Sequence, residues 1–554
     1  MSGRSVSVRR GGRLGGSWAA RALLLLPLTF LGLFFVYPLF EIFRESFASD
    51  GFSLAPFGDI LGDDFFLGRI WFTLWQAVAS TLLTLALGLP SAYIFARYDF
   101  PAKTLIRALT TVPFVMPTIV VAFGFVALVG ANGILPLNLT SSIWIILLAH
   151  TFFNYTVVVR TVSALWAHVD PKTEEAARLL GAGPLQVFWC VTLPQIRPAI
   201  LAAASLVFLF SFTSFGVVLI LGGPQFATVE VTIYNLTARL FRLELAAALS
   251  LIQLAVTFGV MLFYARFQER SAVPLNFQPR AAGARRPRGR REGLLILSNF
   301  LVVLAIVLAP LLALVERSFS GSDGYTLAHY SGLETNTGGR VFFVSLSGAM
   351  KNSLWFAGAT MLVAVPLGTI IAFALARARG RLRTLADALF MLPLGASAIT
   401  LAFGILIALD SPPLNLRASW VVLVIAHSLI AYPFVVRSVL AVVRGIDAEL
   451  REAATMLGAS SLRVFRYIDL PIASRAILVG ATFAFAISLG EFGASLLLTR
   501  PEYSTIPVAI FRYLGQAGAE RLGAALAMSS VLMVVSMAGF LIIERFRYRD
   551  VGEF

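Results

Sequence analysis

Long apolar stretches separated by short polar segments run along almost the whole chain. A helix needs about 20 apolar residues to cross a bilayer, and windows of that length predict twelve membrane-spanning helices. Six lie in the first half, at 22–43, 69–96, 107–130, 141–163, 199–222 and 243–265, and six in the second, at 293–315, 353–376, 384–409, 418–441, 476–499 and 522–545. The pattern predicts an all-α polytopic membrane protein.

The composition supports a membrane protein. Hydrophobic residues make up 58% of the 554 residues and charged residues 13%, whereas about a quarter of a soluble domain is charged. Cys190 is the only cysteine, so no disulfide can form within the chain. We attribute the net charge of +15 to basic loops on one side of a membrane, and we expect no nucleic-acid partner.

Charges in the loops predict the orientation of the chain. Basic residues lie between spans two and three and between spans eight and nine: Arg97, Lys103, Arg107, Arg377, Arg379, Arg381 and Arg383. The loop 44–68, on the opposite side, carries four aspartates, and 131–139 carries no charge. Because cytoplasmic loops are rich in Lys and Arg, both termini are predicted to be cytoplasmic.

The predicted domains follow from these segments. Residues 1–21 are interpreted as a cytoplasmic tail, because the apolar stretch that follows is longer than that of a cleaved signal peptide. Residues 22–267 and 293–546 form two transmembrane domains, and 547–554 a second cytoplasmic tail. The Pro, Gly and Arg rich tract 268–292 is predicted to be a flexible cytoplasmic linker in contact with anionic membrane lipids.

The second half of the chain repeats the first. Leu74, Gly88, Arg97, Pro113 and Gly124 recur 280 positions later as Leu354, Gly368, Arg377, Pro393 and Gly404, and from His150 and His427 onward the offset is 277. Six spans per half is an even number, so the two six-helix repeats are parallel and related by an axis along the membrane normal. Such pseudosymmetry places a pathway between the halves.

A polar loop is duplicated on the predicted cytoplasmic side. Residues 174–200 read EEAARLLGAGPLQVFWCVTLPQIRPAI, and residues 451–477 read REAATMLGASSLRVFRYIDLPIASRAI. Each copy predicts a short helix, a glycine that ends it, and a second amphipathic segment that a proline terminates before the next span. Such a helix either docks into a groove on a soluble protein or lies at the membrane interface.

The motif of Glu-Ala-Ala, three further residues and Gly, with Leu-Pro downstream, resembles the EAA loop of binding-protein-dependent ABC importer permeases. The resemblance implies the type I ABC importer transmembrane fold, in which this loop is a coupling helix gripped by a cytoplasmic ATPase. It implies that the glycine permits a turn and that the glutamate contacts the ATPase or stabilises the loop. The corresponding residues are Glu175, Ala176, Ala177 and Gly181, and Glu452, Ala453, Ala454 and Gly458.

The resemblance also implies partners and a location. They are two copies of a cytoplasmic ABC ATPase, which bind ATP and Mg, and an extracytoplasmic solute-binding protein, all at the inner membrane of a bacterium. The chain has no Gly-x-x-x-x-Gly-Lys-Ser/Thr phosphate loop. We therefore expect no cofactor and no catalytic residue in this chain.

The sequence indicates two candidate solutes. Segments 147–154, 211–234 and 488–498 resemble those of thiamine permeases within the family, and ferric-iron permeases share much of the same pattern. Thiamine is favoured and ferric iron is the alternative. Two other classes of protein are weighed against an importer: an ion-coupled secondary transporter, which can also have two parallel halves, and an intramembrane enzyme.

Four polar residues within predicted spans are candidates for the translocation pathway. Glu491 lies in the eleventh span, where a carboxylate is costly unless it faces protein or water, and its repeat counterpart is Ser214. The alternative for Glu491 is a hydrogen-bonded packing role. His150 and His427 occupy matching positions, and hydrogen bonding between helices is favoured over iron ligation because no Cys or carboxylate cluster lies nearby. No metal site is predicted.

Overall fold

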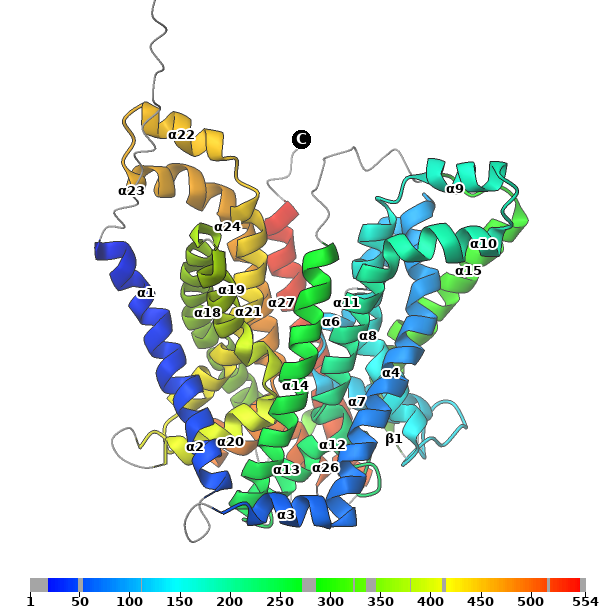
Figure 1. Ribbon diagram of the computed structural model, residues 1–554. Helices are drawn as coiled ribbons and strands as arrows, with labels where there is room; N and C mark the ends of the chain where they lie inside the picture. The colour runs from blue at the N-terminus through cyan, green and yellow to red at the C-terminus, as the bar shows by residue number, and fades with distance from the viewer. Residues whose placement is uncertain are drawn as a thin grey trace, which may run out of the picture.

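The computed structural model describes residues 18–47, 53–110, 112–271, 285–321, 324–334, 345–378, 380–410, 415–515 and 519–548. The predicted tails 1–21 and 547–554 and linker 268–292 therefore lie largely outside the described residues. The described chain is helical apart from loops and one short hairpin, β1 (Ser320–Gly321) with β2 (Gly324–Tyr325). The predicted all-α polytopic class is confirmed (Figure 1).

The helices of the first half run through residue 271, and those of the second half begin at residue 290. The first half contains α1 (Trp18–Leu31), η1 (Gly32–Val36), α2 (Tyr37–Ser46), α3 (Ala55–Gly62), α4 (Asp64–Arg97), α5 (Lys103–Leu109), α6 (Val112–Val115), α7 (Thr118–Val129), α8 (Ile143–Trp166), α9 (Pro171–Leu179), α10 (Pro184–Val187), η2 (Phe188–Thr192), α11 (Leu193–Phe212), α12 (Gly216–Leu221), α13 (Val229–Ala238) and α14 (Leu243–Ser271). The second half contains α15 (Arg290–Val303), η3 (Leu304–Leu308), α16 (Ala309–Phe319), α17 (Ala328–Ser331), α18 (Leu346–Arg377), α19 (Gly380–Gly395), α20 (Ala398–Ala408), α21 (Val421–Arg444), α22 (Ala448–Met456), α23 (Ser461–Val464), η4 (Phe465–Asp469), α24 (Leu470–Gly490), α25 (Gly493–Leu498), η5 (Pro501–Tyr503), α26 (Ile506–Leu514) and α27 (Ala519–Tyr548).

The number of continuous spans is smaller than the twelve expected. In the described part of the chain, ten helices are long and apolar enough to cross a membrane, or eleven if the bent pair Leu385–Gly395 and Ala398–Ala408 is one span. The expected third span is divided into α5, α6 and α7, and the last of these breaks falls at Pro117, whose backbone is extended (ψ 140°). The expected ninth span bends by 95° at Ser397, which caps α20 through its hydroxyl.

The fifth and eleventh spans begin and end earlier than predicted, at Pro184–Phe212 and Ser461–Gly490. The expectation that Pro194 and Pro471 terminate a helix is wrong, because each helix continues through its proline. A π-helical turn ends two residues before each proline, and the same holds for η1 before Pro38 and η3 before Pro310. The wider turn makes room for a ring that would otherwise clash with the carbonyl four residues earlier.

The two halves exchange their first spans. The span built from α1 and α2 packs against α18 and α20 of the second half as well as α14 of its own half. In the same way, α15 and α16 pack against α4 and α7 of the first half as well as α27 of their own. Figure 1 shows α1 beside α18 and α15 beside α4. Two repeated glycines permit this approach: a Cβ at Gly124 would lie 2.8 Å from the Pro310 carbonyl oxygen, and a Cβ at Gly404 3.2 Å from that of Pro38.

Within each half, three long helices form the main bundle. They are α4, α8 and α11 in the first half and α18, α21 and α24 in the second. A Cβ at Gly88 would lie 2.7 Å from a Val158 methyl, and a Cβ at Gly368 2.6 Å from Cβ of Val435. The repeat found in the sequence therefore reflects the same helix crossing in both bundles.

Candidate functional site

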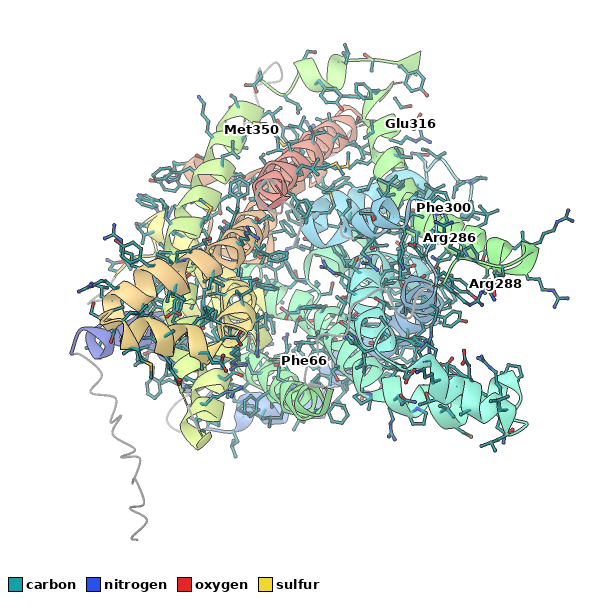
Figure 2. The ribbon with its side chains drawn as sticks, turned by 90° about the horizontal axis from the view of Figure 1, so that it is seen from above. Phe66, Arg286, Arg288, Phe300, Glu316 and Met350 are labelled. Carbon is teal, nitrogen blue, oxygen red and sulfur yellow. The ribbon has the colours of Figure 1, made fainter. Side chains whose placement is uncertain are left out.

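The two copies of the duplicated loop lie at one end of the molecule. Helices α9 and α22 are both at the top of Figure 1, and α3 is at the opposite end. From above, α22 and α23 lie at one edge of the molecule and α9 and α10 at another (Figure 2). The loops are therefore well separated and accessible from the same side.

Each loop turns at its repeated glycine. Asp170 caps the start of helix α9, and its carboxylate accepts the Lys172 N–H at 3.0 Å. The chain turns two residues after the helix, at Gly181, where φ is +88°, and likewise at Gly458 after α22, where φ is +80°. The next N–H, that of Ala182, donates to the carbonyl of Ala177, the second alanine of the motif, at 3.1 Å. This is a helix end that strongly favours glycine, because L side chains are strained at positive φ.

Large apolar side chains project from the turn of each loop. Leu179 and Leu180 are both 89% exposed, and their counterparts Met456 and Leu457 are 90% and 89% exposed. Among the EAA residues, the glutamates and the first alanines are exposed and the second alanines are half-buried: Glu175, Ala176, Glu452, Ala453, Ala177 and Ala454. Clustered exposed apolar groups beside polar residues are typical of a protein interaction surface.

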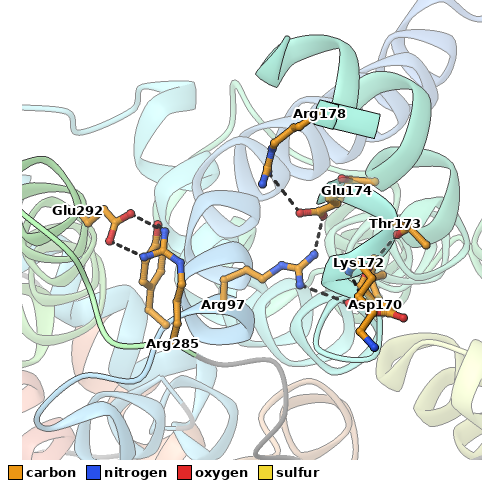
Figure 3. Close-up of polar contacts among 11 residues, drawn as sticks. Arg97, Asp170, Lys172, Thr173, Glu174, Arg178, Arg285 and Glu292 are labelled. Atoms are coloured by element: carbon orange, nitrogen blue, oxygen red, sulfur yellow. Dashed lines mark hydrogen bonds and ion pairs between the residues drawn. The ribbon is translucent and has the colours of Figure 1, made fainter. Parts of the chain in front are cut away.

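A buried ion pair fastens the first loop to the transmembrane helices. The Arg97 guanidinium, at the end of α4, lies 2.5 Å from a carboxylate oxygen of Glu174 on α9, and Arg178 lies 3.6 Å from the other oxygen (Figure 3). The Thr192 hydroxyl donates to the same oxygen as Arg97 at 2.8 Å. The exposed fractions of the Arg97 and Glu174 side chains are 10% and 13%. We call Arg97, Glu174 and Thr192 the first node.

The second loop is fastened by a different arrangement of the same three positions. Asp469 in η4 is 2% exposed and accepts from Arg451 on α22 at 2.7 Å, with Arg377 at 3.6 Å. In the repeat, Arg377, Arg451 and Asp469 correspond to Arg97, Glu174 and Thr192. The carboxylate has thus moved from the surface helix to the span. We call these residues the second node. Neither node was predicted, although Glu174 and Arg451 occupy the same position in the aligned repeat.

The end of the predicted linker is docked on the first half. The Arg285 N–H donates to the Arg97 carbonyl at 3.0 Å, and the Arg285 carbonyl accepts the Asp99 N–H at 2.9 Å. The guanidinium pairs with Glu292 at 2.5 Å (Figure 3). It also lies 5.0 Å from the centre of the Tyr98 ring. Hydrogen bonding to Glu292 raises the pKa of Arg285, and burial raises the pKa of Tyr98. The described end of the linker therefore packs against the end of α4.

A cavity of about 330 Å³ lies between the halves. It is formed where the helices break, at 115–118 and 213–217 in the first half and at 396–398 and 490–493 in the second. Phe215 and Phe492, which are repeat counterparts, stack in its wall with ring centroids 5.7 Å apart. The cavity is therefore lined by matching segments of the two halves.

The cavity brings together three of the four pathway candidates. Glu491, Ser214 and His150 line it, and His427 does not. Glu491 was predicted to lie inside the eleventh span. It lies instead at the break after α24, where its Oε1 accepts the Ala494 N–H at 2.8 Å. The missed signal was the repeated Phe-Gly after Ser214 and Glu491, where both helices break.

The two histidines are not equivalent. His150 shares a hydrogen bond with Ser80 through Nδ1 at 2.9 Å, and its buried Nε2 has no partner among the described residues. His427 bonds Ser488 and Ser495 at 2.8 and 2.9 Å through its two nitrogens. In the described chain, no three His, Cys, Asp or Glu side chains are grouped so that they could hold a metal ion.

Comparisons with known proteins agree with this architecture. Residues 84–273 and 364–549 each match the family described as binding-protein-dependent transport system inner membrane component. A probable ABC transporter permease protein, y4fN of Sinorhizobium fredii, is 27% identical, covering 86% of this chain and 87% of the relative. The thiamine transport system permease proteins ThiP of Escherichia coli and Brucella abortus are 26% and 28% identical, with coverage of 88% and 87% of this chain and 90% and 88% of the relatives.

Proposed function

The chain belongs to the family of binding-protein-dependent transport system inner membrane components and is an ABC importer permease; from this premise we propose that two copies of a cytoplasmic ABC ATPase dock on α9 and α22. The ATPase binds ATP and Mg, and this chain contributes no catalytic group. Both termini face the cytoplasm of a bacterial cell. A solute-binding protein delivers the solute at the opposite face.

The observation that carries this proposal is the pair of exposed apolar turns on one side of the molecule. Leu179, Leu180, Met456 and Leu457 project from loops that nodes of charged residues hold against the spans. A groove on a soluble partner would bury these side chains. The duplication of the loop matches a partner that is itself twofold.

The loops are connected to the cavity by continuous helices. The helix that follows α9 runs from Pro184 to Phe212, 29 residues or roughly 44 Å at 1.5 Å per residue. It ends at the break that lines the cavity, and the helix Ser461–Gly490 does the same in the second half. Drawing α9 and α22 together upon ATP binding would therefore tilt both helices and open the cavity to the other side.

The extracytoplasmic face presents loops that could receive a binding protein. It includes α3, with Asp59 and the helix-capping Asp63, and the described parts of 223–242 and 316–350. Leu54 and Leu61 at the ends of α3 are 62% and 60% exposed. An amphipathic helix with such residues can lie at the membrane surface and form the rim of an entry site.

We take thiamine as the solute, with ferric iron as the alternative. Support comes from the relatives whose names specify thiamine transport. It also comes from the cavity lining, which includes one carboxylate, one imidazole and five phenylalanines. A hard ferric ion requires several oxygen ligands, whereas aromatic rings and one carboxylate suit a flat organic cation.

The docking proposal is tested by replacing Glu175 and Glu452 together with lysine. We expect the ATPase to be lost on purification and ATP-driven uptake in proteoliposomes to fall at least about tenfold, because two charges on the docking surfaces are reversed. The control is Arg286→Glu with Arg288→Glu, which changes two exposed charges beside α15, outside the loops (Figure 2). Retention of the ATPase with full uptake in the lysine variant would refute docking. Uptake driven by an ion gradient without ATP would favour a secondary transporter.

A further inference from the structure

The cavity between the halves is lined by a single acidic side chain. Glu491 is the one carboxylate among its lining residues, and none of them is Lys or Arg. In the described part of the chain no salt bridge involves Glu491. Its counterpart Ser214 lines the same cavity, so the two halves are unequal at this point.

The rest of the lining is suited to a flat apolar body. Phe153, Phe210 and Phe434 line the cavity in addition to the stacked pair Phe215 and Phe492. The faces of aromatic rings attract cations, especially where water is excluded. A volume of about 330 Å³ is at the lower end of the range for small-molecule pockets, about 300–1,000 Å³.

A helix cap does not account for Glu491 by itself. One oxygen, Oε1, accepts the Ala494 N–H at 2.8 Å, and a serine or asparagine would do this without a full charge. At the matching position the first half has Ser214 before an equally short helix, α12. The local backbone therefore does not require a carboxyl group at position 491.

The geometry points to a binding site for one organic monocation in this cavity, with its positive charge beside Glu491 and its ring among the phenylalanines. This inference rests on the proposed importer function and specifies its solute class. A metal cation fits this lining less well than an organic one, because Glu491 is its single anionic ligand and His150 its single imidazole. The other side-chain donors are neutral: Thr118, Asn154, Thr213, Ser214 and Ser397.

The test uses the complex of this chain with its ATPase in nanodiscs, without ATP or binding protein, and radiolabelled thiamine as the probe. Glu491→Gln keeps an acceptor for the Ala494 N–H but removes the charge, and we expect thiamine to bind about tenfold more weakly. Ser214→Glu adds a second carboxylate to the lining, and we expect tighter binding. The double variant, with the charge relocated, is expected to recover to within about threefold of the wild type. The control is Glu502→Gln on an exposed outer loop, which should leave binding unchanged.

Several results would overturn the inference. They are a wild-type complex without saturable thiamine binding, unchanged affinity in Glu491→Gln or Ser214→Glu, and loss in Glu491→Gln without recovery in the double variant. Stronger binding of ferric citrate than of thiamine would do the same. Failure of this inference can be told apart from failure of the importer proposal, because the docking variants change the loops and leave the cavity untouched. If ATP-driven uptake is intact but thiamine binding does not depend on Glu491, only the cation site is rejected.

Discussion

The two nodes fasten equivalent loops with the charges differently placed. In the first node the buried groups are Arg97 and Glu174, one on a span and one on the surface helix. In the second node the buried group is Asp469 on the span, and its partners Arg377 and Arg451 are 61% and 34% exposed. Both arrangements hold the surface helix to the spans. They differ in which buried group loses its charged partner when a node is broken: Arg97 in the first node and Asp469 in the second. The repeat thus conserves a mechanical connection while its chemistry has changed.

The largest effect on stability is expected when the arginine of the second node is placed in the first node without the aspartate that pairs with it. Glu174→Arg removes the carboxylate that pairs with both Arg97 and Arg178 and places a third guanidinium beside them. We expect a loss of several kcal/mol, more than the ~3 kcal/mol typical of breaking a buried pair, and near-complete loss of uptake. Adding Thr192→Asp rebuilds the second node in the first half and should recover most of the stability. Thermal unfolding of the purified protein and ATP-driven uptake measure both.

The matched control for the charge transplant is Glu449→Arg on α22. Glu449 is exposed and corresponds to Lys172 in the repeat, so a basic residue there should leave the unfolding temperature unchanged. If Thr192→Asp fails to improve on Glu174→Arg alone, the two nodes are not interchangeable. A double-mutant cycle over the two positions gives the coupling energy directly.

Removing the acid from each node should have unequal effects. Glu174→Ala leaves Arg97, which is 10% exposed, with the Val169 carbonyl but no carboxylate as partner, and we expect a cost of about 3 kcal/mol. Asp469→Ala leaves two arginines that reach water, and we expect about 1 kcal/mol, close to the value for an exposed pair. The unfolding temperatures of the two variants in one detergent make the comparison. Equal shifts would show that burial of the cation does not control the strength of the node.

The two loop glycines should behave alike, in contrast to the nodes. Gly181 and Gly458 have φ of +88° and +80°, and an added Cβ would meet no atom within 4 Å at either position. Alanine therefore costs only backbone strain, about 1–2 kcal/mol in each half. Unfolding temperatures and uptake of the two single variants should fall to the same extent. A marked difference between them would mean that one loop relaxes its turn.

Repetition in the sequence predicted what both halves do in the same way. Gly88 and Gly368, and Gly124 and Gly404, recur because they face the same helix crossings, and the loops recur with their glycine turns. Helix breaks were missed because hydropathy windows average over Pro117 and Ser397, which have extended backbones. The exchange of first spans was missed because an apolar helix carries little information about which bundle it joins. The nodes were missed because a search for identities passes over positions where the charge has moved.

The smallest effect on stability is expected at the docked end of the linker, which contacts the first node through Arg97. Arg285→Ala removes the pair with Glu292 and the contact with the Tyr98 ring, but the hydrogen bonds of the Arg285 backbone to Arg97 and Asp99 do not need the side chain. Because exposed pairs contribute little to stability, we expect an unchanged unfolding temperature and uptake reduced by less than about twofold. Arg285→Pro removes the N–H that bonds the Arg97 carbonyl, and its effect should exceed that of alanine. If Arg285→Ala lowers stability or uptake more than Arg285→Pro, the side chain rather than the backbone hydrogen bonds holds this segment beside Arg97.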